Sequence, residues 1–187
     1  MAPRLIAVGL IFETPVNELY NMYIMNREVH FLVTRHAKPE NNIEVDPGIN
    51  KMRATKDISS AAWTIFSGLE DVNTEGLVIF TSPKRRAIET AYGFAESNDL
   101  SGMVVGQPVI DIDLDDRDFD IMSRDERTLK WAPVLERLAQ TALSMKDNEK
   151  LPSILLITHE PIIRSIPQLD YGRNLNNLGI NEFTTQV

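Results

Sequence analysis

Cysteine is absent from this chain of 187 residues. Its absence excludes disulfide bonds, thiolate nucleophiles and cysteine-based zinc sites. Histidine is scarce as well: only His30, His36 and His159 are present, and so few imidazoles make a histidine-rich metal site unexpected. The composition therefore argues against a cysteine-based or histidine-rich metal site, and we expect neither a metal ion nor another cofactor.

The chain also lacks any apolar stretch long enough to cross a bilayer. Residues 5–12 are apolar and follow Arg4, as in a signal peptide, but Glu13 and Pro15 come directly afterwards without an A-x-A-like cleavage site. We therefore expect a cytoplasmic protein that does not contact a membrane.

Basic residues are in the minority. The chain has 19 lysines and arginines against 27 aspartates and glutamates, which gives a formal net charge of −8 at pH 7. A general nucleic-acid-binding surface would need a basic face, so we expect no nucleic-acid partner. An anionic ligand stays open, because a local cluster of arginines can bind phosphate in an acidic protein.

The composition is otherwise that of an ordinary globular protein, with 43% apolar and 25% charged residues. A chain of this length can bury one sizeable core. Residues 1–27 stand apart from the first clear strand and are predicted to be an N-terminal extension of unknown role. Residues 28–187 are predicted to form one domain.

Short apolar runs rich in β-branched residues alternate along this domain with segments of helical periodicity. Buried parallel strands are predicted at 29–34, 77–80 and 153–157, with weaker strands within 104–112 and at 178–184. Helices are predicted at 51–69, 84–95 and 125–145, and another begins near Pro161. This alternation predicts a three-layer α/β sandwich with a mostly parallel central sheet.

Four residues have expected local roles in the helices. Trp63 is predicted to be a core aromatic beside the apolar face of the helix at 51–69. Ser82 is a suitable N-cap for the helix at 84–95, and Pro83 suits its first position. Pro133 is expected only near the first turns of the helix at 125–145, or at a kink.

The three clear strands are each followed by residues with reactive or cationic side chains. These segments are Thr34-Arg35-His36, Thr81-Ser82-Pro83 with Arg85 and Arg86 after it, and Thr158-His159. Because the carboxyl ends of parallel strands open on one edge of a sheet, we expect these side chains to lie together. The N-terminus of the helix at 84–95 would lie beside them. Arginine and histidine donors gathered there predict a phosphoryl site.

The same segments resemble the motifs of the histidine phosphatase superfamily, in its phosphoglycerate mutase-like branch. The family's Arg-His-Gly signature has its counterpart at Arg35-His36-Ala37, and its Ser-Pro-x-x-Arg-Ala-x-x-Thr-Ala stretch corresponds to Ser82–Ala91. The Leu-x-Glu-Arg segment corresponds to Leu114-Asp115-Asp116-Arg117, and the His-Gly-x-x-Ile-Arg motif corresponds to His159–Arg164. The four motifs occur in the family's order and span the chain from about residue 28 to its C-terminus.

This resemblance implies a phosphoglycerate mutase-like fold and a metal-independent phosphomonoester hydrolase. His36 would then be the nucleophile that carries the phosphoryl group. Arg35, Arg86 and His159 would bind the phosphoryl oxygens. Asp116 would protonate the leaving oxygen and later deprotonate the attacking water. The implied substrate is a phosphorylated small molecule or a phosphoprotein, and a homodimer is one assembly open to the chain.

Four positions depart from the family's pattern. Ala37 replaces the glycine after the nucleophile, where glycine allows close backbone approach. Glu160 replaces the glycine after His159 and would bring a carboxylate near the phosphate site. Asp116 is one methylene shorter than the usual glutamate, and Asp120 stands where glycine is common.

These departures leave several interpretations open. Asp113, Asp115 and Asp118 compete with Asp116 for the role of acid. Arg164 can either form a structural ion pair or contact substrate. A binding or scaffold protein that keeps the fold without turnover is the alternative to an enzyme, and a mutase is the weaker alternative within the enzyme class.

Overall fold

The computed structural model describes residues 28–40, 46–70, 72, 74, 76–116, 123–145, 152–169 and 174–186. The predicted N-terminal extension, residues 1–27, lies outside these ranges. Arg117, Asp118 and Asp120 of the acidic segment lie outside them too.

A single sheet of five strands runs through the described part of the chain, in the order β3-β2-β4-β1-β5. The strands are β1 (Glu28–Arg35), β2 (Leu77–Thr81), β3 (Val109–Ile110), β4 (Ser153–Thr158) and β5 (Ile180–Gln186). Strands β3, β2, β4 and β1 are parallel to their neighbours, and β5 pairs antiparallel with β1. The predicted mostly parallel sheet is therefore confirmed.

The position of each strand follows from its residues. Every residue of β2 and β4 is buried, as expected for central parallel strands that are covered on both faces. In β5, buried Asn181 and Phe183 are separated by exposed Glu182, because an antiparallel edge strand can turn one face to solvent. The ring of Phe183 stacks on that of Phe31 in β1, with centroids 5.2 Å apart.

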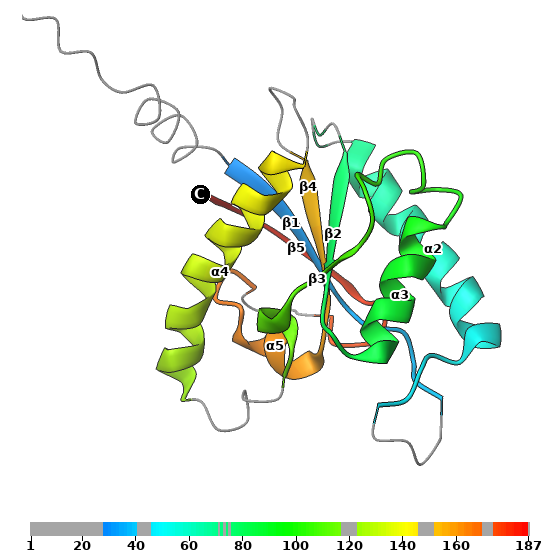
Figure 1. Cartoon of the computed structure of the whole chain (residues 1–187), viewed down its shortest axis with the longest axis horizontal. Helices are drawn as coiled ribbons and strands as arrows, with labels where there is room; N and C mark the ends of the chain where they lie inside the picture. The colour runs from blue at the N-terminus through cyan, green and yellow to red at the C-terminus, as the bar shows by residue number, and fades with distance from the viewer. Residues whose placement is uncertain are drawn as a thin grey trace, which may run out of the picture.

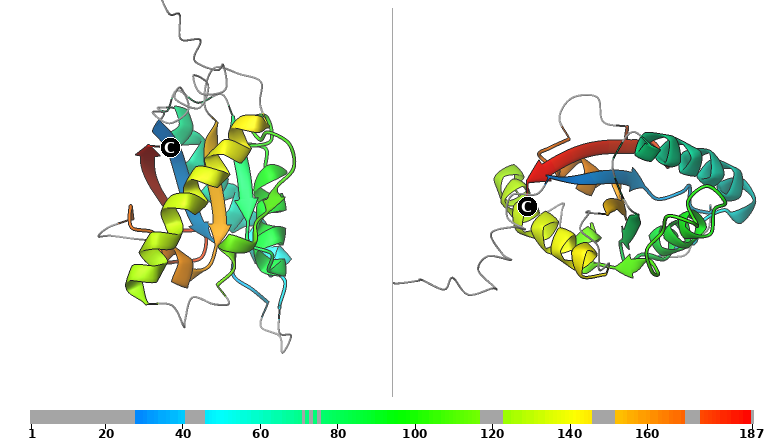
Figure 2. Two further views of the ribbon diagram at one scale, coloured as in Figure 1. Left: turned by 60° about the vertical axis from the view of Figure 1, so that its left-hand side comes forward. Right: turned by 90° about the horizontal axis from the view of Figure 1, so that it is seen from above.

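Helices cover both faces of the sheet (Figures 1 and 2). Helices α2 (Lys51–Glu70) and α3 (Arg85–Ala95) lie on one side, and α4 (Arg124–Ser144) and α5 (Glu160–Ser165) lie on the other. A short 3-10 turn, η1 (Ile112–Leu114), follows β3. None of the described helices is long and apolar enough to cross a membrane. The predicted three-layer sandwich is confirmed.

Two apolar clusters fill the spaces between the layers. Because side chains alternate along a strand, Phe31 and Val33 pack toward α4 and α5, whereas Leu32 between them packs toward α2 and α3. Trp131 of α4 is fully buried in the first cluster, and its indole N–H donates to the Ser165 hydroxyl at 2.9 Å. The sheet is thus held rigidly on both faces, which fixes the positions at which its strands end.

The prediction that Trp63 belongs to the core is wrong. Its side chain is 59% exposed and tilts against Phe66 on the outside of α2, with ring centroids 5.9 Å apart. The buried face of α2 is marked by Ile58, Ala62 and Ile65. Trp63 directly follows Ala62, and one residue step of about 100° carries its side chain away from that face.

Helix α4 begins with a capping box that is visible in the sequence. The Ser123 hydroxyl accepts from the Glu126 N–H, and the Glu126 carboxylate accepts from the Ser123 N–H at 2.7 Å. Pro133 lies well inside the helix, beyond the first turns where it was expected. It is on an exposed face, where water can bind the carbonyl that the missing proline N–H leaves unpaired.

Candidate active site

The site lies where β1, β4 and β2 end, on one edge of the sheet (Figure 1). In the parallel register, Arg35 of β1 is opposite Thr158 of β4, and Thr81 of β2 is opposite Ile157. His36, Ser82 and His159 are the next residues along these strands. The His36 N–H still donates to the Thr158 carbonyl at 3.1 Å, so the ladder holds the first of them in place.

His36 is only 4% exposed, and its ring is oriented by two hydrogen bonds. Nδ1 lies 2.7 Å from the Ala37 carbonyl oxygen, which can only accept, so Nδ1 carries the proton. Nε2 accepts from Arg86 Nε at 3.0 Å. Burial lowers the pKa of His36 to about 4, and the charges of Arg86 and Arg35 act in the same direction. The ring is therefore neutral at pH 7, with its lone pair on Nε2.

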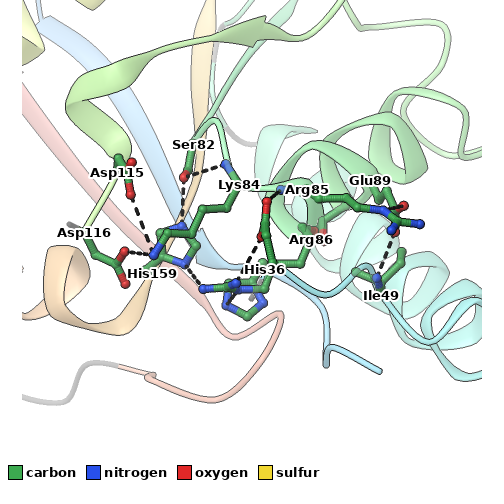
Figure 3. Close-up of polar contacts among 12 residues, drawn as sticks. His36, Ile49, Ser82, Lys84, Arg85, Arg86, Glu89, Asp115, Asp116 and His159 are labelled. Carbon is green, nitrogen blue, oxygen red and sulfur yellow. Dashed lines mark hydrogen bonds and ion pairs between the residues drawn. The ribbon is translucent and has the colours of Figure 1, made fainter. Parts of the chain in front are cut away.

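His159 is the second buried imidazole of the site, at 2% exposed. Its ring centroid lies 5.0 Å from that of His36, with the two planes inclined by 58°. Arg86 Nη2 lies 3.5 Å from Nδ1, and Nε2 lies 2.8 Å from the Ser82 hydroxyl. Burial lowers the pKa of His159 to about 3 against the opposing charge of Asp116, and the charges of Arg86 and Lys84 act in the same direction as burial. One guanidinium thus contacts both neutral histidines (Figure 3).

Arg86 enters the site from the first turn of α3, whereas its neighbour Arg85 does not. The Arg85 side chain is half exposed and donates to Glu89 at 2.9 Å, one turn along the same helix. Arg86 also lies 3.4 Å from Asp46, which comes from the loop before α2. Of the two adjacent arginines, it is therefore Arg86 whose guanidinium reaches the histidines.

Ser82 is not the N-cap of α3. The N-cap is Lys84, which makes no side-chain capping bond, and the helix begins at Arg85. The Ser82 hydroxyl accepts from the Lys84 N–H at 3.3 Å and bonds His159 Nε2. Because Arg86 can only donate to Nδ1 of His159, Nε2 is the protonated atom and donates to Ser82. The sequence motif contained Ser82, but nothing in its spacing indicated this contact.

Arg35 lies beside the site but is bound elsewhere. Its Nη1 donates to the Glu160 carboxylate at 2.9 Å and to the Leu175 carbonyl at 3.2 Å. Glu160 also accepts from Arg164 at 2.6 Å, so Arg164 forms an ion pair within α5. The hydrogen bond from Arg164 lowers the pKa of Glu160, with a further contribution from Arg35. The Glu160 carboxylate, which follows His159 in the chain, is therefore bound by two guanidinium groups that offset its charge.

Asp116 is the carboxylate beside the histidines. It follows η1 and forms an ion pair with Lys84 Nζ, which also lies 3.7 Å from Asp115 Oδ1. Burial raises the pKa of Asp116, but the hydrogen bond from Lys84, the neighbouring His159 imidazole and the charges of Lys84 and Arg86 outweigh it and lower the pKa. Lys84 was missed as a site residue. The only signal was a third cation beside Arg85 and Arg86.

The competing aspartates are placed differently. Asp113 is bound by Arg137 at 2.8 Å and lies 3.3 Å from Lys130, on the side of α4. Asp115 is buried, and its carboxylate lies 3.7 Å from the same Lys84 ammonium that pairs with Asp116. Asp118 lies outside the described residues. Asp116 is accordingly the described aspartate whose charge acts on both His36 and His159.

The backbone around the nucleophile candidate is also held by side chains. Ala37 is fully buried in the cluster beneath α2 and α3, and its N–H donates to the Thr90 hydroxyl at 3.0 Å. The Asn177 amide donates to the His36 carbonyl at 2.7 Å. The methyl group of Ala37 therefore packs in the core at the position where glycine was expected.

The described residues contain no group of three or more histidine, aspartate or glutamate side chains that could hold a metal ion. The groups that converge on the site are two neutral imidazoles, a guanidinium, an ammonium and a carboxylate. Together they offer a nucleophile, hydrogen-bond donors for a tetrahedral anion, and a group that can exchange a proton.

Comparison with known proteins points to one fold. No family model and no curated protein sequence matches the chain. Solved structures do match. A phosphoglycerate mutase from Bacillus anthracis str. Sterne matches with a TM-score of 0.55 and 14% identity, over 88% of this chain and 91% of that one. A phosphoserine phosphatase from Entamoeba histolytica, in complex with 3-phosphoglyceric acid, matches with a TM-score of 0.54 and 16% identity, over 83% of this chain and 90% of that one. The protein histidine phosphatase SixA, complexed with tungstate, also matches, with a TM-score of 0.51 and 16% identity over 79% of this chain and 81% of that one. The chain has the fold shared by the histidine phosphatases and phosphoglycerate mutases.

Proposed function

We propose that this protein hydrolyses phosphate monoesters through a phosphohistidine intermediate, with His36 as the nucleophile. One observation carries the proposal. His36 is buried and neutral, its proton is held on Nδ1 by the Ala37 carbonyl, and its Nε2 lone pair meets the Arg86 guanidinium. A neutral imidazole with a free lone pair beside fixed cationic donors is suited to attack a phosphorus atom.

The reaction has two displacements. In the first, His36 Nε2 forms a bond to phosphorus while the bond from phosphorus to the leaving oxygen breaks, and Asp116 is the candidate to give that oxygen a proton. In the second, water attacks the phosphohistidine, Asp116 accepts the proton of the water, and inorganic phosphate and neutral His36 are released. The two steps are balanced without a redox partner.

Arg86 and His159 are the candidates to bind the non-bridging oxygens. Arg86 now donates to His36 and His159, so an incoming anion would take these donors from two neutral rings. Negative charge beside Nδ1 of His159 favours the protonated imidazolium, which would add a second donor. Arg35 would join them only after it leaves the Glu160 carboxylate.

Neighbours of the same fold are described as a protein histidine phosphatase and a phosphoserine phosphatase, and the former is complexed with tungstate, a tetrahedral oxyanion. They support hydrolysis as the reaction type and a small phosphorylated molecule or a phosphoprotein as the substrate. The pair between Arg35 and Glu160 favours the second candidate, a binding protein with weak or no turnover, because it withdraws one cation from the phosphate site.

The test is hydrolysis of para-nitrophenyl phosphate between pH 4 and 8 in the presence of a chelator. We expect His36→Ala to lose activity by a factor on the order of 10³ or more, because removal of a nucleophile leaves only the binding groups. His30→Ala is the matched control. His30 lies on β1, the strand that leads to His36, but its side chain bonds Ser153 and faces Glu182 rather than the site. It should retain wild-type activity.

The intermediate gives a second readout. Rapid acid-free quenching of the wild type during turnover should trap a base-stable, acid-labile phosphate on His36 that is missing from His36→Ala. A folded wild type that neither turns over an aryl phosphate nor acquires this phosphate would overturn the proposal in favour of the binding protein.

A further inference from the structure

We infer that Lys84 selects the substrates of this site: by pairing with Asp116 it stops that carboxylate from donating a proton, so the site favours acyl and aryl phosphates over phosphates of aliphatic alcohols. The inference rests on the proposed function. It assigns a role to Lys84, a residue that the motifs did not single out, and it names the substrate class.

The geometry of the pair carries the inference. Lys84 Nζ forms an ion pair with Asp116 Oδ1 and lies 3.7 Å from Asp115 Oδ1, so the ammonium is held between two carboxylates. The Lys84 side chain is 25% exposed and that of Asp116 is 19% exposed, which limits screening by water. Figure 3 shows Asp116 and the end of the Lys84 side chain next to His159.

The charges around Asp116 act in the same direction. Lys84 from the start of α3 and Arg86 from its first turn both favour the ionised carboxylate, and Lys84 also lies 3.7 Å from Asp115. Burial alone would raise the pKa of Asp116, yet the contact with Lys84 and the other cations lower it. At neutral pH the pair therefore keeps Asp116 ionised, so that of the two roles proposed for this carboxylate it fills only that of the base.

The chemical consequence differs between the two displacements. In the first, the bond from His36 Nε2 to phosphorus forms and the leaving oxygen departs with its electron pair but without a proton. Only weakly basic leaving groups, such as a carboxylate or a phenolate, depart readily in that form. In the second, the ionised Asp116 is the form needed to accept the proton of the attacking water. The pair thus leaves the second step intact and restricts the first.

The experiment compares para-nitrophenyl, phenyl and ethyl phosphate at pH 7 as substrates of wild type, Lys84→Met and Lys84→Arg. The measured quantity is the ratio of kcat/KM for the nitrophenyl ester to kcat/KM for the ethyl ester, in which a shared change in phosphate binding cancels. Each unit by which the pKa of Asp116 rises increases its protonated fraction about tenfold at pH 7. We therefore expect Lys84→Met to reduce the ratio about tenfold or more.

Two controls isolate the charge. Lys84→Arg keeps a cation beside Asp116 and should keep the wild-type ratio. Lys130→Met removes a lysine that faces an aspartate, Asp113, away from the histidines, and should also leave the ratio unchanged. If Lys84→Met does not fold, Lys84→Gln removes the same charge with a polar side chain and decides the question in its place.

The outcomes separate the two proposals. A reduced ratio in Lys84→Met alone supports the inference. If wild type hydrolyses the aryl esters but the ratio is the same in Lys84→Met, Lys84 does not select substrates, while the phosphohistidine mechanism stands. If wild type hydrolyses none of the three esters and acquires no phosphate on His36, the proposed function is overturned and the inference with it.

Discussion

His36 and His159 both contact the Arg86 guanidinium, and neither ring carries a positive charge that would repel it. Both are buried, and both have a pKa well below the ordinary value of 6.5. A charged imidazole at either place would lie against Arg86, so the neutral form is what allows three nitrogen-rich groups to pack together. An incoming dianion would reverse that balance. The site is thus suited to bind an anion.

Glu160 weakens this site for anions because it binds Arg35. We predict that Glu160→Gln tightens the binding of inorganic phosphate roughly fivefold, because a partly exposed charge of this kind contributes about 1 kcal/mol. The substitution removes the negative charge beside Arg35 and leaves the side chain the same size. The dissociation constant from calorimetric titration is the measurement.

Glu182→Gln is the matched control for this change. Glu182 also faces a basic side chain, with its carboxylate 3.7 Å from His30 Nε2, but it lies on β5 away from the site. Phosphate should bind this variant as it binds the wild type. Unchanged or weaker binding by Glu160→Gln would show that Glu160 does not oppose the anion.

Helices α2 and α3 approach each other closely at one glycine. A Cβ on Gly93 of α3 would lie 2.8 Å from Cδ1 of Ile58 in α2, which is closer than carbon atoms pack. The approach matters for the site, because the first turn of α3 carries Arg86.

We predict that Gly93→Ala and Ile58→Val are coupled. Alanine favours a helix over glycine by about 1 kcal/mol, but in the wild type its methyl group strikes Ile58. Ile58→Val removes the Cδ1 that is struck. Urea unfolding of the two single variants and the double variant should give a favourable coupling free energy of about 1 kcal/mol or more. Strictly additive effects would mean that the two helices simply move apart.

The buried histidines also affect the stability of the whole molecule. In the unfolded chain each takes up a proton near pH 6.5, whereas in the fold His36 does so only near pH 4 and His159 near pH 3. Between these values the unfolded state binds more protons, so the free energy of unfolding falls as the pH falls below about 6.5. The contribution of these two histidines to the free energy of unfolding is fully present above about pH 6.5 and is lost progressively below it.

We predict that His159→Gln reduces this pH dependence. Glutamine can still bond Ser82 but takes up no proton, so the melting temperature of the variant should fall less than that of wild type between pH 7 and pH 5. The two slopes of melting temperature against pH are compared, because the substitution also changes the melting temperature at pH 7. Parallel slopes would mean that His159 is not the group that titrates on unfolding.

The sequence alone determined the frame of the site. Apolar runs that stop at His36, at Ser82 and at His159 specify strands by their β-branched residues, and parallel strands must end on the same edge of the sheet. The α/β layers and the expectation that the two histidines and Arg86 lie together follow from these features. Each strand and each motif is recognised from residues that are close together in the chain, whereas the strand order was not predicted.

Only the tertiary structure decided which side chains meet. Lys84 and Asp116 are 32 positions apart, and Arg35 and Glu160 are 125 apart, so neither pair has a local signature. The exposure of Trp63 and the bond from Ser82 to His159 likewise depend on how helices pack on the sheet. Such pairs form because the packed core brings strand ends together, and their charges then set which groups of the site can hold a proton.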